Sequence, residues 1–322
     1  MTQAYCVSAH KNPQQVRMLV DHLCEEDLVY MNVFNHRGAG ERAAWGKWFS
    51  DIPPDRLFIR YRYKRGWGTF SQVQAALDAM NYFKDAKYTH FVNLSGQCYP
   101  IKPMDEVRDF FRRSPETSFM EAQAVVYEEG EEGYNPDILG RLGYWWIRYP
   151  DIYFRLTGRS NFGFRNKFLK VRRRWNKEVP GGLRPYKGSS WFMLSKDAVD
   201  HVLEAIAGDP RIIGFFRRSG LPDESFFHTI LMNSALPVVS EPQGLHYIDW
   251  SRDDVPNPPV LDGRYFDALR SSPKLFARKF DIVAEPGIST GRARARGEDL
   301  GGAAPARPGR GLRRPAPPSV DS

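Results

Sequence analysis

The stretch YCVSAHKNPQQVRMLVDHLCEEDLVYMNVF, residues 5–34, contains one amphipathic segment between two apolar runs. The runs at 5–9 and 27–34 are short and include β-branched residues, which favours buried strands. The segment between them has its apolar residues on one face of a helix, at Val16, Leu19, Val20 and Leu23. A strand, a helix and a second strand in this order predict an α/β fold.

The same alternation continues along the chain. Further strands are expected within 57–62, 88–96, 117–123 and 188–194, and further helices within 66–83, 103–114, 195–208 and 221–233. We therefore predict one α/β domain over residues 1–284, with a mostly parallel sheet flanked by helices. Ligands of such sheets bind beyond the carboxyl ends of the strands.

The composition is that of a folded protein with two basic segments. Of the 322 residues, 42% are hydrophobic and 14% aromatic, which is enough to build a core. Two segments together carry more positive charge than the net charge of +8 of the whole chain, and the rest of the chain is net acidic. Residues 155–187 carry eleven Lys or Arg and one acid, Glu178, among aromatic residues, and we predict an insertion there. Residues 285–322 contain seven Arg, four acids and no aromatic residue, so we expect a disordered tail.

Cysteine spacing and hydropathy bear on the location of the protein. Cys6, Cys24 and Cys98 are widely spaced and form no CxxC pair, which argues against a disulfide framework and fits a reducing compartment. A strand-like run begins at about residue 4, so no signal peptide is expected before it. No apolar run approaches the ~20 residues of a membrane span. We therefore expect a cytoplasmic protein, or one bound peripherally to the inner membrane.

The sequence contains no recognisable metal or dinucleotide motif. The seven histidines show no ligand spacing, and no DxD follows a predicted core strand, so no metal is expected. The glycines at 66–68 lack the GxGxxG spacing, and no GxxxxGK[ST] occurs. A resident cofactor is therefore not expected.

Carboxylates and strand-end turns are the first candidates for a ligand site. PDESFFHTIL (222–231) puts Asp223 and Glu224 in the first turn of a predicted helix, where the helix dipole stabilises negative charge. Such residues often only stabilise the helix, but a carboxylate there also stays ionised, as a general base must. LSGQCYP (94–100) and KGSSWFML (187–194) lie at strand ends, where both ligand loops and ordinary turns occur.

Basic segments are the second kind of candidate. KLFARKFD (274–281) sets two cations between Phe276 and Phe280, which is typical of a last helical turn with its aromatic residues in the core. The basic and aromatic segment 155–187 fits nucleic acid, an anionic membrane surface or a phosphorylated substrate. No nucleic-acid-binding motif accompanies it, so that partner is not expected.

Seven pieces of the chain occur in one characteristic order: SAHKNPQQV (8–16), GWGTFSQVQAALDAM (66–80), FVNLSGQCYPIKP (91–103), KGSSWFMLSKDAVDHVL (187–203), PDESFFHTI (222–230), LHYIDWS (245–251) and LFARKFD (275–281). Together they resemble the core-2/I-branching N-acetylglucosaminyltransferases, glycosyltransferase family 14, which includes the peptide O-xylosyltransferases. The resemblance spans about residues 4–283. PDExxxxTI and FARKFD are its two most specific pieces.

The resemblance implies a GT-A-like, Rossmann-like fold, a nucleotide-sugar donor, inversion at the anomeric carbon, and no metal. Glu224 matches the family's catalytic base. Lys279, assisted by Arg278, matches the basic group that stabilises the departing diphosphate in place of a metal. The residues expected to bind or border the donor and acceptor are Trp67, Gly68, Ser95, Gly96, Ser189, Ser190, Trp191 and Asp223.

Three departures from the family pattern leave the donor's identity open. Cys98 stands where the family often has Asp in SGxDxP, and MNVFN (31–35) replaces the usual HxD after the second strand. His246 or Arg252 stands near a second phosphate-binding Arg of the branching enzymes, so we expect one of them at the diphosphate. The animal enzymes are membrane-anchored and disulfide-bonded, and the absence of both patterns indicates a bacterial relative.

We therefore expect an inverting, metal-independent transferase that moves N-acetylglucosamine or xylose from a UDP-sugar to a glycan or lipid-linked acceptor, in surface polysaccharide assembly. The segment 155–187 would lie against an anionic membrane, hold an anionic acceptor, or be a solvated insertion. Two alternatives stay open. One is a catalytically silent relative that binds nucleotide sugars or glycans, and the other is a nucleic-acid-binding protein with steeply salt-dependent binding.

Overall fold

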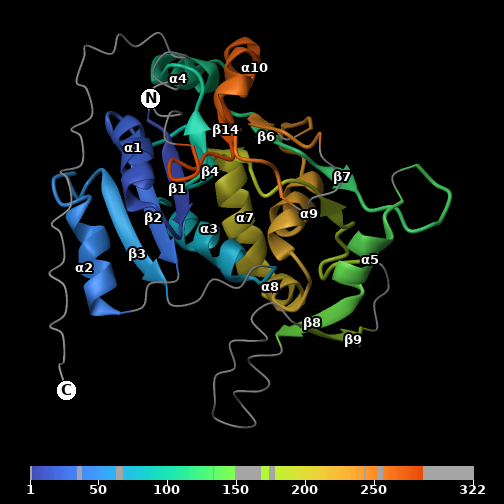
Figure 1. The fold of residues 1–322 in the computed structure, drawn as a ribbon. Helices are drawn as coiled ribbons and strands as arrows, with labels where there is room; N and C mark the ends of the chain where they lie inside the picture. Colours follow the sequence, from blue (N-terminus) through green and yellow to red (C-terminus); the bar gives the residue numbers. More distant parts are fainter. Residues whose placement is uncertain are drawn as a thin grey trace, which may run out of the picture.

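The computed structural model describes residues 2–34, 38–62, 68–132, 134–148, 168–173, 178–242, 244–251 and 257–285. In this part of the chain, a seven-stranded sheet has the order β12-β6-β11-β4-β1-β2-β3 (Figure 1). Its strands are β1 (Ala4–Ala9), β2 (Leu28–Phe34), β3 (Leu57–Arg62), β4 (His90–Ser95), β6 (Ser118–Met120), β11 (Met193–Ser195) and β12 (Val238–Ser240). All neighbours pair in parallel except β11, which is antiparallel to β4 and β6. The predicted α/β fold with a mostly parallel sheet is confirmed.

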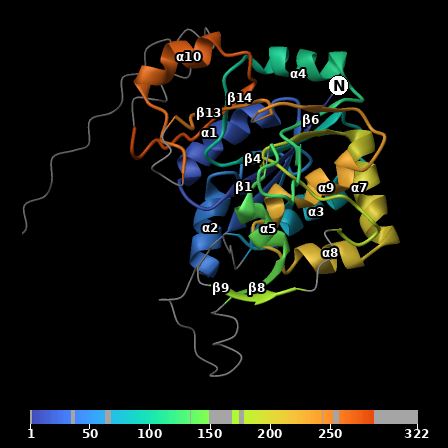
Figure 2. The ribbon, with the colours of Figure 1, turned by 90° about the vertical axis from the view of Figure 1, so that its right-hand side faces the viewer.

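Alternation along the strands gives the sheet two buried faces. In β1, Tyr5 and Val7 belong to one face, and Ala4 and Cys6 to the other. The first face is covered by α1 (Pro13–Cys24), α2 (Ala39–Lys47) and α4 (Met104–Arg113). The second is covered by α3 (Ser71–Tyr82), α7 (Lys196–Gly208), α8 (Arg211–Phe216) and α9 (Phe226–Met232) (Figure 2). The four apolar residues predicted on one face of α1 are fully buried.

Two segments predicted to be helical differ in the structure. The helix expected from residue 221 begins with a separate 3₁₀ turn, η2 (Pro222–Glu224), and α9 starts only after it. The helical turn expected in KLFARKFD is wrong, because Phe276–Arg278 form the strand β14. This strand pairs in parallel with β13 (His246–Ile248) and antiparallel with β5 (Tyr99–Pro100). Both partners are distant in sequence, so local pattern alone does not indicate the pairing.

Between β6 and β11 the chain forms short elements that lie outside the main sheet. They are α5 (Pro136–Leu142), the pair of β7 (Gln123–Ala124) with β10 (Tyr186–Lys187), and the pair of β8 (Tyr144–Arg148) with β9 (Phe168–Arg172). Of the predicted insertion, 155–167 and 174–177 lie outside the described residues, as do residues 286–322 of the predicted tail. The three cysteines are unbridged. None of the helices in the described ranges is long and apolar enough to cross a membrane.

Candidate active site

A cavity of about 930 Å³ lies at the edge of the sheet where the parallel strands end. Because β11 runs the opposite way, its amino end lies at the same edge as the carboxyl ends of β4 and β6. Residues that follow β1, β4 and β6, or precede β11, therefore line the cavity: His10, Gln97, Glu121, Ser189, Ser190 and Trp191. The remaining walls include η2, α5 and the segment at the end of β14.

Glu224 is the last residue of η2 and lines this cavity, and a hydrogen bond to its backbone holds η2 in place. The Gly188 N–H donates to the carbonyl oxygen of Glu224 at 2.9 Å, which ties η2 to the segment before β11. Its neighbour Asp223 is 8% exposed and accepts a hydrogen bond from the Ser190 hydroxyl at 2.8 Å. The two adjacent acids thus differ in exposure, since Asp223 is almost buried whereas the Glu224 side chain is partly exposed.

Arg141 is the charged partner of Glu224. Its Nη1 lies 2.5 Å from the Glu224 Oε2, and the glutamate side chain is 35% exposed. Arg141 belongs to α5 and is held by Asp137, one turn earlier, at 2.6 Å. Burial raises the pKa of Glu224, the charge of Asp223 raises it further, and Arg141 opposes both. The pKa remains above that of an ordinary glutamate, so the ionised carboxylate is a stronger base than a free one.

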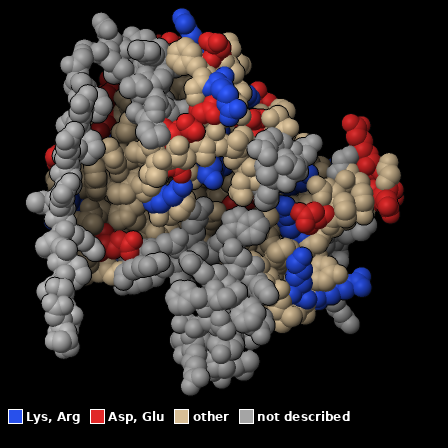
Figure 3. All heavy atoms as spheres, in the orientation of Figure 1, with Lys and Arg blue, Asp and Glu red and all other residues tan. Residues whose placement is uncertain are grey.

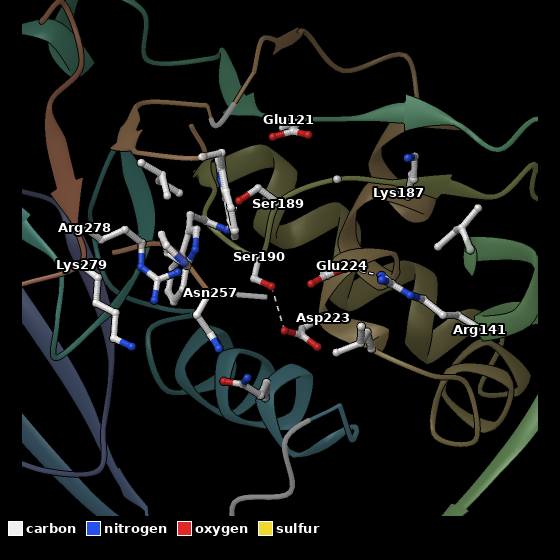
Figure 4. A pocket seen from close by; sticks show the side chains of 18 of the residues that line it. Glu121, Arg141, Lys187, Ser189, Ser190, Asp223, Glu224, Asn257, Arg278 and Lys279 are labelled. Atoms are coloured by element: carbon white, nitrogen blue, oxygen red, sulfur yellow. Dashed lines mark hydrogen bonds and ion pairs between the residues drawn. The ribbon is translucent and has the colours of Figure 1, made fainter. Parts of the chain in front are cut away.

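Arg278 and Lys279 form a basic wall on the other side of the cavity. Figure 4 shows the two cations across the cavity from Glu224 and Arg141. The Arg278 guanidinium lies 4.1 Å from the centre of the Trp191 ring, a cation–π contact. Burial lowers the pKa of Arg278, but a guanidinium stays charged at neutral pH. The cavity therefore has the Glu224–Arg141 ion pair on one side and two further cations on the other.

Buried neighbours fix the position of this basic wall. Phe276 and Phe280, which flank the cations, are fully buried, as predicted. The Gln15 side chain, also buried, donates from Nε2 to the carbonyl oxygens of Gly96 (2.8 Å) and Phe280 (3.0 Å). The backbone that carries Lys279 is thus joined to α1 and to the turn after β4.

Seven of the predicted site residues lie in the wall of the cavity: Ser189, Ser190, Trp191, Asp223, Glu224, Arg278 and Lys279. They come from three parts of the chain that the fold brings together. Trp67 and Arg252 lie outside the described residues.

Gly68, Ser95 and Gly96 support the wall rather than line it. Gly68 has a φ of +71° and accepts a hydrogen bond from the Leu221 N–H at 3.2 Å, just before η2. A Cβ atom on Gly96 would lie 2.8 Å from Cγ2 of Val16, so the close packing of the turn on α1 requires glycine there. Ser95 is buried in the same turn.

His246 lies behind the wall, so the predicted contact with a diphosphate is not supported. Its ring is fully buried, with its centre 5.6 Å from that of Phe276 and 5.9 Å from that of Trp191. Burial lowers its pKa to about 3, and the cations of Arg278 and Lys274 add to this effect. A neutral ring beneath Trp191 packs against the wall and does not supply a charge to an anion.

Cys98, one of the departures from the family pattern, lies close to Arg278. Cys98 is buried, and its Sγ accepts a hydrogen bond from the Ser95 N–H at 3.3 Å. The thiol is close enough to Arg278 to influence the pKa of its guanidinium. A cysteine therefore stands beside Arg278 at the position where the family often has Asp.

The acids of the cavity do not gather into a metal site. In the part of the chain that the structure describes, no group of three or more His, Cys, Asp or Glu could hold a metal ion. Glu224 is paired with Arg141, and Asp223 is hydrogen-bonded to Ser190.

Several cavity residues were not anticipated from the sequence. Arg141 is 83 positions from Glu224, and its i,i+4 pair with Asp137 resembles an ordinary helix-surface ion pair. Glu121 and His10 were also missed. His10 directly follows the strand predicted at 5–9, at the edge where ligands bind, and this position was the available signal. Glu121 falls inside the strand predicted at 117–123, which gave no such signal.

Comparison with known proteins identifies the family. The family model described as Branch: Core-2/I-Branching enzyme matches residues 2–261. Xylosyltransferase oxt of Drosophila melanogaster is 25% identical over 213 residues, which cover 63% of this chain and 21% of that protein. Beta-glucuronosyltransferase GlcAT14B of Arabidopsis thaliana is 24% identical over 193 residues, which cover 59% and 40%. Mouse xyloside xylosyltransferase 1 is a solved structure with 11% identity and a TM-score of 0.33, covering 85% of this chain and 97% of that one, a likeness too loose to bear on the site.

The chain thus spans about a fifth to two fifths of the length of these two curated relatives. The family model nevertheless covers most of the chain, including the cavity walls from β1 to β13. The chain belongs to the Core-2/I-branching enzyme family, which is a family of glycosyltransferases.

Proposed function

We propose that the chain is an inverting, metal-independent glycosyltransferase that uses a UDP-sugar. The observation that carries the proposal is the placement of Glu224 across one cavity from Arg278 and Lys279. A single displacement at an anomeric carbon needs one base for the incoming hydroxyl and one positive group for the departing diphosphate. In this proposal, Glu224 on one side of the cavity is the base, and Lys279 and Arg278 on the other side are the positive groups.

In the proposed reaction, the acceptor hydroxyl gives its proton to Glu224 as its oxygen bonds to the anomeric carbon. The bond from that carbon to the UDP oxygen breaks on the opposite side, which inverts the configuration. Negative charge grows on the diphosphate as the bond breaks, and the cations of Lys279 and Arg278 stabilise it. These cations would take the place that a divalent metal has in many nucleotide-sugar enzymes.

The proposed donor carries N-acetylglucosamine or xylose, and the names of the relatives add glucuronic acid to the sugars to be tested. The proposed acceptor is a glycan or a lipid-linked sugar, in the assembly of a bacterial surface polysaccharide. Glu121 and Arg141 lie on the side of the cavity near Glu224, where the acceptor would enter.

Release of UDP from a panel of UDP-sugars, with and without glycan acceptors, tests this proposal. We expect one UDP-sugar to be consumed, and the rate to be unchanged by EDTA. Failure to release UDP from any donor would favour a catalytically silent, sugar-nucleotide-binding relative. Inhibition by EDTA that added Mn²⁺ reverses would contradict the metal-independent mechanism.

Replacing Arg141 by Ala should move the acid limb of the kcat/KM profile to higher pH. The general base must be ionised, so activity falls as the pH drops through the pKa of Glu224. Arg141 lowers that pKa against the effects of burial and Asp223, and its removal lets the pKa rise further. At neutral pH we expect kcat/KM to fall about tenfold or more.

The matched variant Arg141→Lys keeps a positive charge at this position and should restore most of the profile. The measurement is kcat/KM from pH 5 to 9 for the three proteins. A loss of rate at all pH values with an unshifted acid limb would instead make Arg141 a substrate-binding residue that leaves Glu224 unaffected.

A further inference from the structure

Side chains of α9, and of the residue that follows it, bind the backbone of the segment 184–190, which leads into the cavity wall. The Arg184 N–H donates to Oδ1 of Asn233 at 3.1 Å, and Nδ2 of Asn233 donates to the Arg184 carbonyl oxygen at 2.7 Å. The Tyr186 N–H donates to the Thr229 hydroxyl at 3.1 Å, and this hydroxyl donates to the Tyr186 carbonyl oxygen at 3.3 Å. Polar side chains thus take the place of a neighbouring strand on this side of the segment.

His228 makes the contact of this kind that lies nearest the cavity. It is fully buried, and its Nε2 lies 2.9 Å from the carbonyl oxygen of Ser189. A carbonyl oxygen only accepts hydrogen bonds, so Nε2 carries the proton and the ring is the donor. Burial lowers the pKa of His228 to about 4, although the hydrogen bond to Ser189 opposes this effect. The ring is therefore neutral at neutral pH, and the tautomer protonated at Nε2 is the one that binds Ser189.

The segment passes between the end of β6 and the His228 ring with no space to spare. A Cβ atom on Gly188 would lie 1.7 Å from the carbonyl oxygen of Glu121 and 2.7 Å from Cδ2 of His228. The backbone of Glu121 is on one side and the ring is on the other. Loss of the ring would therefore leave the segment free to shift toward α9.

Two hydrogen bonds transmit the position of this segment to η2, the turn that carries Glu224. The Gly188 N–H donates to the Glu224 carbonyl oxygen at 2.9 Å. The Ser190 hydroxyl donates to Oδ2 of Asp223 at 2.8 Å. Residues on either side of Ser189 thus bind two consecutive residues of η2, and a shift of the segment would move the carboxylate of Glu224.

We infer that His228 is a positioning residue, which binds the Ser189 carbonyl oxygen and so holds the segment 188–190 where it orients Glu224. This role rests on the proposed function, in which Glu224 is the base. The ring is fully buried, so it acts through the segment and touches no substrate. A displacement of a reacting group by about 1 Å can lower a rate about 100-fold, so a fixed segment matters to turnover.

His90 provides a matched control for the substitution of His228. It is fully buried, its Nε2 lies 2.9 Å from the carbonyl oxygen of Thr117, and burial lowers its pKa to about 4. His90 is the first residue of β4, at the edge of the sheet opposite the cavity. His228→Leu and His90→Leu thus remove the same kind of hydrogen bond at two different places.

We expect His228→Leu to lower turnover about 30-fold, and the affinity for UDP to change by less than about twofold. His90→Leu should keep nearly normal turnover. Steady-state transfer with saturating substrates measures the first effect, and the thermal shift caused by UDP measures the second. A residue that only stabilised the fold would lower the midpoint of urea unfolding without changing turnover per folded molecule.

Two polar replacements of His228 decide the case even if the leucine variant does not fold. Glutamine has an amide N–H at about the reach of the ring Nε2, whereas the amide of asparagine is too short to reach Ser189. His228→Gln should restore turnover to within about threefold of that of the natural chain, whereas His228→Asn should stay about 30-fold lower.

Amide hydrogen exchange at Gly188 tests the same role without any need for activity. This amide should exchange at least about tenfold faster in His228→Leu and at its normal rate in His90→Leu. Figure 3 shows acidic side chains that protrude at the right of the view, beyond the strand β7 of Figure 1. The exposed residues 128–132 of this stretch should exchange equally in all the proteins and serve as the internal reference.

Normal turnover in His228→Leu, an equal loss in His90→Leu, or unchanged exchange at Gly188 in His228→Leu would overturn the role of His228. So would turnover in His228→Gln as low as in His228→Asn. If the natural chain transferred no sugar from any UDP-sugar, the proposed function would fail. Faster exchange at Gly188 in His228→Leu alone would then still show that the ring holds the segment.

Discussion

Glu224→Gln is expected to lower the turnover of sugar transfer about a thousandfold, while the protein still binds its donor. Glutamine keeps the shape of the side chain but cannot accept the acceptor's proton, and a positioned base contributes about 10² to 10⁴ in rate. The fold should tolerate the change, because Arg141 keeps Asp137 as its partner. Removing a carboxylate whose pKa burial has raised also removes a charge that folding does not favour.

Turnover with saturating donor and acceptor, together with the thermal shift caused by UDP, measures the two effects separately. Glu121→Gln is the control, since it neutralises another carboxylate of the same cavity. If Glu121→Gln abolished transfer and Glu224→Gln did not, the base would have been assigned to the wrong carboxylate.

Lys279→Ala should lower turnover about 100-fold or more and change stability little, whereas Phe280→Ala should lower both. A cation placed where charge develops in the transition state contributes at about the level of an oxyanion-hole donor. The Lys279 side chain lines the cavity, so its loss leaves no void in the core. Phe280 is fully buried, and truncation of such a ring costs about 3–5 kcal/mol.

Urea denaturation and steady-state transfer assays on the two variants give the comparison. Lys274→Ala is the matched control, because this lysine lies in the same stretch but pairs with Glu241 and the carbonyl oxygen of Gly244. It should retain nearly normal turnover. An equal loss of turnover in Lys274→Ala and Lys279→Ala would show that the stretch acts through folding and that Lys279 has no special role.

The first half of the fold was predictable because local pattern and final structure agree there. The run 57–62 has the same bounds as β3, and the helix expected after residue 12 is α1. The stretch KLFARKFD was different. Its conformation depends on β13 and β5, so its three paired residues form a strand although their apolar spacing also suits a helix.

The candidate site was predictable only in part, for a related reason. Asp223, Glu224 and the two cations stand in motifs that can be recognised along the chain. The only sequence feature at Arg141 is its spacing from Asp137, which is that of an ordinary ion pair within a helix. Its contact with Glu224 arises from the packing of α5 beside η2. His246 shows the opposite case, since its place in the order of motifs suggested a ligand contact whereas the fold buries it beneath Trp191.

The reversed direction of β11 bears on how specificity can diverge within this architecture. Phe119 in β6 pairs with Met193 in β11. The chain therefore leaves the sheet after β6 and re-enters it in the adjacent strand β11. The intervening residues therefore form one long excursion, which carries Arg141, Ser190 and the β8–β9 hairpin. Such a segment can be lengthened, shortened or exchanged without altering the register of any sheet strand. The part of the cavity wall that this segment supplies can thus change independently, while Glu224 and the cations of 278–279 remain outside it.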